Sequence, residues 1–247
     1  MIKSLLTFSL LLSLHSMASG IPPVEKNDQQ ARFKLNAFYK LTDWDTLVFK
    51  GDYFQATDDR DEKSLTFEYR HRIHNNFKVG GYGTYLLGKR YDDDWIKAPS
   101  WTWDNTEDRS EFLIGANISY KKLISFITNS IFEFRLTNEH NTRNSHNHTI
   151  LRPCFTKVFF NQGKALINYY FQYELIIPSN YSDETISEQW LYTGFTWHLT
   201  RRFKPGVFVQ KGFGKWTTSE SFSKSPGGNY SIDHKYTVLG LSLNIYL

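Results

Sequence analysis

The sequence predicts an all-β protein: a transmembrane antiparallel up-and-down β-barrel of about twelve strands, with ten as the alternative. Three observations support this. Segments in which apolar and polar residues alternate recur about eleven times along the chain. Several of these segments reach about ten residues or more, which is the length that crosses a membrane when tilted. The links between them alternate between short and long.

The alternation is clearest in "KALINYYFQYELIIP", residues 164–178. One parity of this stretch is apolar or aromatic throughout, whereas the other carries Asn168, Gln172 and Glu174. A two-residue period of this kind indicates a strand with two different faces. No sustained helical stripe of apolar residues occurs, so almost no helix is expected. The expected strands are 32–41, 46–56, 63–73, 77–89, 110–121, 124–138, 148–160, 165–177, 188–200, 206–217 and 235–247.

The links favour a membrane barrel over a soluble one. Short links such as "LTDWDT" and "NQGK" alternate with long polar ones such as "RYDDDWIKAPSWTWDNTEDR". Transmembrane barrels have tight turns on one side of the membrane and longer loops on the other. A soluble β-sandwich or lipocalin-like barrel would instead turn its apolar faces inward. Strand length, link alternation and the closing strand "YTVLGLSLNIYL" weigh against that alternative.

The N-terminal residues "MIKSLLTFSLLLSLHSMASG" indicate export. Lys3, an apolar run and the small residues Ser16 and Ala18 form the pattern of a secretory signal peptide over residues 1–18, and the run is too short for a membrane-spanning helix. A polar lead-in over residues 19–31 and a barrel over 32–247 are expected to follow. Localisation in the outer membrane follows from the signal peptide and the barrel together. Cys154 is the only cysteine, so no intramolecular disulfide can form.

The strand count leaves one question open. Single-chain bacterial barrels have even numbers of strands, yet about eleven segments alternate. If the last strand ends in the periplasm and successive strands alternate in direction, the segment 32–41 runs from the outer surface towards the periplasm. An additional ascending strand within residues 22–31 would give twelve, and its absence leaves ten as the alternative.

Insertion into a membrane would place one parity of each strand against lipid and the other against the lumen. Residues such as Phe67, Ile114 and Leu241 would face lipid, and the opposite parity would face the lumen. Two interpretations of the charged lumen compete: pairing across a plugged interior, or a cationic track for anionic solutes. The expected pore-lining residues are Lys34, Lys50, Glu68, Arg70, Arg72, Lys78, Glu133, Arg135 and Arg152.

The order of elements resembles a known family. The link rhythm, the paired-strand unit "EYRHRIHNNFKVGGYGTYLLGKRY" and the closing "DHKYTVLGLSLNIYL" are similar to those of the oligogalacturonate-specific porins, small monomeric outer-membrane porins for acidic oligosaccharides. The resemblance is one of topology. It implies a twelve-stranded barrel with a narrow, arginine-lined lumen. The inward arginines fit this family in part, whereas the absent first strand and the lumen carboxylates depart from it.

Two polar links contain candidate ligand sites. Asp92, Asp93, Asp94, Trp95, Trp101 and Trp103 could bind Ca²⁺ through carboxylates or sugars through the indole faces, although no EF-hand spacing is present. The alternative is a solvated loop with an interfacial aromatic anchor. His140, His146 and His148 suggest a metal site, but a polar loop is the favoured interpretation and no metal site is predicted.

Enzymatic activity is not expected. A hydrolase would need a nucleophile beside a base at the outer rim, and only Ser187 with His198 can be drawn, without a supporting motif. The predicted function is a channel for passive diffusion of small solutes, anionic ones such as acidic oligosaccharides among them, with a closed structural or surface-binding barrel as the alternative. The expected partners are outer-membrane lipid and small solutes. The mild net charge of +4 gives no reason to expect nucleic acid, and a monomer without cofactors is predicted.

Overall fold

The computed structural model describes residues 24–57, 61–91, 106–142, 147–179, 188–217 and 231–247, which form eleven strands. Loop candidates within 92–105, and Ser187, lie outside these residues. None of the described residues forms a helix long and apolar enough to cross a membrane. The strands are β1 Val24–Lys40, β2 Asp45–Ala56, β3 Asp61–His74, β4 Phe77–Tyr91, β5 Thr106–Leu123, β6 Ser130–Asn141, β7 Asn147–Asn161, β8 Lys164–Pro178, β9 Glu188–Trp197, β10 Phe203–Thr217 and β11 Ser231–Tyr246.

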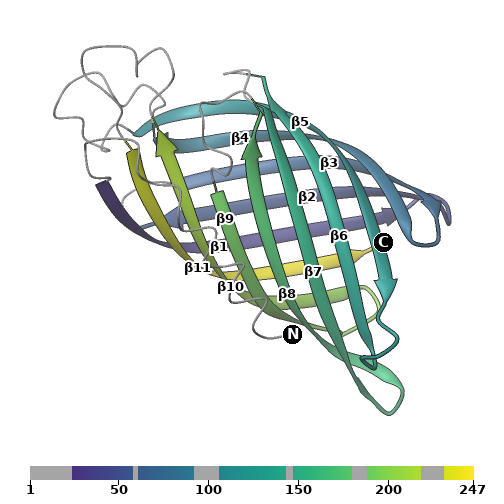
Figure 1. The fold of residues 1–247 in the computed structure, drawn as a ribbon. Helices are drawn as coiled ribbons and strands as arrows, with labels where there is room; N and C mark the ends of the chain where they lie inside the picture. Colours follow the sequence, from purple (N-terminus) through teal and green to yellow (C-terminus); the bar gives the residue numbers. More distant parts are fainter. Residues whose placement is uncertain (1–23, 58–60, 92–105, 143–146, 180–187, 218–230) are drawn as a thin grey trace, which may run out of the picture.

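The strands close into one barrel in which each pairs with its neighbours in sequence and β1 pairs with β11 (Figure 1). All neighbouring pairs are antiparallel except β1 and β11, which are parallel over fifteen residue pairs. The parallel pair is a consequence of the odd strand number, because strands that alternate in direction leave the first and eleventh pointing the same way. Closure leaves no open edge with unpaired backbone groups.

The all-β class and the closed barrel are confirmed, and the strand number is eleven. No separate ascending strand lies within the described residues 24–31, because these residues form the first half of β1. The lead-in prediction for this segment is therefore wrong. Residues 27–30 are all polar and lack an apolar parity, so their alternation could not be recognised. Pairing of this segment with β11 makes it a strand.

The turns divide the barrel into two ends. At the short-turn end, β1, β3, β5, β7 and β9 each lead into a turn, and β11 ends. The opposite, long-link end contains the start of β1 and the finish of β2, β4, β6, β8 and β10. The "NQGK" turn is a two-residue hairpin loop in which Gln162 and Gly163 both have positive φ, at 49° and 75°. That geometry matches the twist of antiparallel strands. The turn before β6 is longer than expected, because residues 124–129 do not belong to the strand.

The outward parity of the strands is apolar, as predicted. Phe67, Ile114 and Leu241 are each about half exposed, whereas the inward neighbour Glu68 is fully buried. Phe49 and Phe67 contact each other edge to face on the outer surface. The belt of exposed apolar side chains surrounds the barrel, which is the arrangement that a surrounding hydrocarbon phase would stabilise.

Large aromatic rings that lie over glycines of a neighbouring strand fill part of the interior. A Cβ on Gly240 would lie 2.0 Å from the Phe208 ring, and one on Gly115 would lie 2.2 Å from the Tyr82 ring. Each ring therefore covers the backbone of a neighbouring strand where no side chain fits. Phe208, Val238 and Tyr236 are buried in this region, so the interior near β10 and β11 is packed.

Candidate functional site

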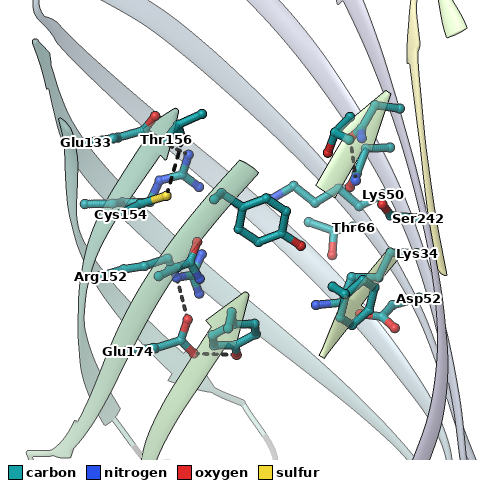
Figure 2. A pocket seen from close by; sticks show the side chains of 18 of the residues that line it. Lys34, Lys50, Asp52, Thr66, Glu133, Arg152, Cys154, Thr156, Glu174 and Ser242 are labelled. Atoms are coloured by element: carbon teal, nitrogen blue, oxygen red, sulfur yellow. Dashed lines mark hydrogen bonds and ion pairs between the residues drawn. The ribbon is translucent and has the colours of Figure 1, made fainter. Parts of the chain in front are cut away.

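The barrel encloses a cavity of about 480 Å³. Side chains from nine strands line it, and β4 and β5 contribute none among the described residues. Figure 2 shows Arg152, Cys154 and Glu174 on one side of the cavity, and Lys34 and Lys50 on the other. The volume is in the range of small-molecule sites.

Six of the nine residues predicted to line the pore lie at the cavity, and strand stagger decides which residues of one parity reach it. Glu68 lies behind the lining and is fully buried. Arg72 and Lys78 are register partners close to the short-turn end and do not line the cavity. The predicted residues that do line it are Lys34, Lys50, Arg70, Glu133, Arg135 and Arg152.

Glu68 connects two of the cavity's cations. Its carboxylate accepts two hydrogen bonds from Arg70, at 2.8 and 2.7 Å, and lies 2.6 Å from the Lys50 ammonium. The Asn117 amide donates a further bond at 3.2 Å. A carboxylate with no solvent exposure needs such compensation, because an uncompensated buried charge is costly. Lys50 and Arg70 are therefore held in place by a shared anion.

Two further ion pairs connect side chains of neighbouring strands. Arg32 donates two hydrogen bonds of 2.8 Å to Asp52. Arg152 donates to Glu174, which Tyr192 also approaches at 3.5 Å. The second pair lies where Pro153 interrupts the β7–β8 ladder between Leu151 and Cys154. Proline lacks the backbone donor that the ladder uses, so the side-chain pair connects the strands at that point.

Arg135 is incompletely compensated. Its only hydrogen bond is a long one of 3.3 Å to Glu133, and its buried Nε has no hydrogen-bond partner in the part of the chain that the structure describes. Arg152 lies directly opposite on β7, so two guanidinium groups occupy one cross-strand pair. Like charges at directly opposed positions destabilise a sheet. An anion in the cavity would relieve this repulsion.

Lys34 has no carboxylate partner among the described residues. Its ammonium lies 5.0 Å from the Phe208 ring centroid and 5.5 Å from that of Tyr192. Ring faces attract cations by their quadrupole, but they do not neutralise the charge. Lys34 thus contributes a basic group to the cavity that no described carboxylate contacts.

The cavity and the side chains paired with it have a positive formal charge. Six cations (Arg32, Lys34, Lys50, Arg70, Arg135 and Arg152) stand against four carboxylates (Asp52, Glu68, Glu133 and Glu174). The difference is +2. Charges of one sign within a low-dielectric wall raise the local concentration of the opposite ion. The cavity should therefore attract anions and repel cations.

Sequence reasoning missed several neutral lining residues. Cys154, Tyr170, Tyr192 and Phe208 line the cavity but were not predicted. Tyr170 lies between Tyr169 and Phe171 in sequence, and its parity alone distinguishes it from these outward-facing neighbours. The parity of β10 was left unassigned, and the structure places Phe208 inside and Lys211 outside.

The other candidate sites do not assemble within the described residues. All six predicted loop residues between Asp92 and Trp103 lie outside them, as does His146. His140 and His148 lie at adjacent register positions of β6 and β7 but on opposite faces. No group of residues suited to a metal occurs in the described ranges. His198 follows β9 at the short-turn end, whereas Ser187 immediately precedes this strand in sequence.

No protein-family model matches the chain, and no curated protein matches it either.

Proposed function

We propose that the protein is an outer-membrane channel through which small anionic solutes, such as acidic oligosaccharides, diffuse passively. The observation that carries the proposal is the net positive cavity inside a closed barrel with an apolar exterior. Arg135 and Lys34 supply charge that no fully formed ion pair neutralises. Hydroxyl and amide side chains, including Asn168, Gln172 and Ser242, offer hydrogen bonds to a hydrated or polyhydroxylated solute.

The native cysteine provides the test of this proposal. Cys154 lines the cavity beside Arg152 and is the only cysteine of the chain. In planar bilayers the refolded protein should give discrete conductance steps. A negatively charged methanethiosulfonate should reduce this conductance, and it should react at least several-fold faster than a positively charged analogue because the cavity attracts anions. Cys154→Ser should conduct normally and resist both reagents.

The second candidate is a closed structural or surface-binding barrel. The observation that favours it is the burial of polar side chains in the interior, with Glu68, Gln210 and His234 fully buried. Such a barrel would give no conductance steps, and its thiol would not react from the aqueous phase. Silent bilayers together with an unreactive Cys154 would therefore replace the channel by this alternative.

The orientation in the membrane gives a separate prediction. An epitope inserted within residues 58–60, between β2 and β3, should be accessible to antibody on intact cells, because that link belongs to the long-link end. An epitope inserted between Gln162 and Gly163 should become accessible only after the outer membrane is permeabilised. Equal accessibility of both insertions on intact cells would contradict the orientation.

A further inference from the structure

We infer that the short-turn end of the barrel from β5 to β10 binds a lipid surface with anionic headgroups. The inference rests on the proposed membrane location, but it concerns the outside of the barrel and not the cavity. Three consecutive turns form this surface, which we name the basic rim: residues 124–129, 162–163 and 198–202 with their flanking cations. Its cations are Lys121, Lys122, Lys157, Lys164, Arg201 and Arg202.

Backbone hydrogen bonds make the three turns contiguous. The Val158 amide donates to the Asn129 carbonyl at 2.9 Å and connects the first turn to the β7–β8 hairpin. The His198 amide donates to the Leu166 carbonyl at 2.9 Å and connects that hairpin to the third turn. In Figure 1 the β7–β8 hairpin projects far beyond the neighbouring strands at this end. The basic rim is therefore one continuous surface.

The basic rim is free of carboxylates. Residues 112–132, 155–173 and 191–217 contain no Asp or Glu. Among the described residues, Glu133 lies opposite Lys121 on β6 and lines the cavity. Other acidic side chains of this end lie on the turn before β2, where Asp43 pairs with Lys40 at 2.5 Å and Asp45 lies 2.8 Å from the His71 ring. Burial and then the nearby Lys204 charge lower the pKa of the His198 imidazole in the third turn. The charge of the basic rim is thus mainly positive and complements an anionic partner.

Exposed apolar side chains accompany these cations. Phe126 is 86% exposed, and Leu123 and Leu199 are each 70% exposed, although all three lie at or beyond the strand ends. Phe160 and Leu166 are half exposed on the β7–β8 hairpin. Basic residues interspersed with large apolar side chains are the composition of surfaces that insert among anionic headgroups. The apolar belt of the barrel wall continues into this rim at Trp197 and Phe203, so one lipid layer can contact both.

The test compares lipid retention by the full chain refolded in nanodiscs of phosphatidylglycerol or phosphatidylcholine. Native mass spectrometry of the detergent-extracted barrel counts the lipid that stays bound. Each basic side chain near an anionic surface raises binding about fivefold, so the wild type should retain phosphatidylglycerol at least tenfold more than phosphatidylcholine at low salt. The variant Lys122→Gln with Arg201→Gln and Arg202→Gln should lose this preference.

A matched variant removes three exposed cations of the barrel wall outside the basic rim: Lys63→Gln, Lys211→Gln and Lys235→Gln. It should keep the preference. Equal retention of both lipids by the wild type, or a preference that survives in the rim variant, would overturn the inference. Tighter binding of soluble polyglutamate than of phosphatidylglycerol would also overturn it and indicate an acidic protein partner. A chain that enters neither nanodisc would contradict the membrane location itself, which is a distinct outcome.

Discussion

If the proposed channel function holds, replacing two cavity arginines by acids, Arg70→Glu with Arg135→Glu, is expected to change its ion preference from anions to cations. Six cations and four carboxylates give the cavity a charge of +2, and each substitution changes the charge by −2, which leaves −2. Focused fields of this kind change local ion concentrations by about tenfold or more. The reversal potential across a bilayer in a KCl gradient should therefore change sign.

The control for this experiment carries the same charge change outside the lumen. Lys63→Glu with Lys235→Glu alters two exposed side chains of the outer wall and should leave the reversal potential almost unchanged. The double arginine variant removes one of two cationic partners of the buried Glu68, so its refolding must be confirmed by heat-dependent gel mobility. A refolded variant that stays anion-selective would show that ions do not pass the Arg70 and Arg135 side chains.

A larger side chain at the glycine where β10 and β11 meet should cause the largest loss of stability among the variants proposed. A Cβ on Gly240 would lie 2.0 Å from the Phe208 ring, so Gly240→Val forces the ring or the backbone to move. Overpacking of this kind costs about 1–3 kcal/mol, and more where the ring cannot rotate away. The midpoint of urea unfolding in detergent should fall accordingly. Adding Phe208→Ala to Gly240→Val should recover part of the loss, because the space for the valine is then available.

Gly51 supplies the comparison. It lies on the outer face, where a Cβ would meet only ordinary contacts at 3.9 and 4.0 Å. Gly51→Val should change the unfolding midpoint little, and a valine fits the geometry of a strand. If Gly240→Val unfolded at the wild-type midpoint while Gly51→Val did not, the inward assignment of Phe208 would be wrong.

Alternation predicted the strands wherever one face is apolar, and it failed where that contrast is absent. The start of β1 was missed because Asn27, Asp28, Gln29 and Gln30 present polar groups on both parities. The start of β6 was placed too early for the opposite reason, since Ile124, Phe126 and Ile127 continue the apolar pattern into a turn. Local patterns report burial and not pairing, so the parallel contact between β1 and β11 could not be recognised from sequence.

The sequence predicted the charged character of the cavity, but it did not predict which residues line it. Parity identified six residues that line the cavity among the nine predicted pore residues, because charges avoid the apolar face. It could not distinguish Arg70, which lines the cavity, from Arg72, which lies nearer the short-turn end, since both share one parity. That distinction depends on the stagger of neighbouring strands around the barrel, which is a property of closure.

The parallel pairing of β1 with β11 also limits how this chain could be rearranged. Val24 and Tyr246 lie at opposite mouths of the barrel, because the two strands run side by side in the same direction. A circular permutant would need a linker as long as the wall is tall, about fifteen residues at roughly 3.3 Å each. In a membrane such a linker would have to pass through the lumen, because a polar segment would not pass through the surrounding hydrocarbon. Joining the two ends would thus give a barrel with a covalently attached plug inside its lumen. The length of the linker would determine the size of that plug.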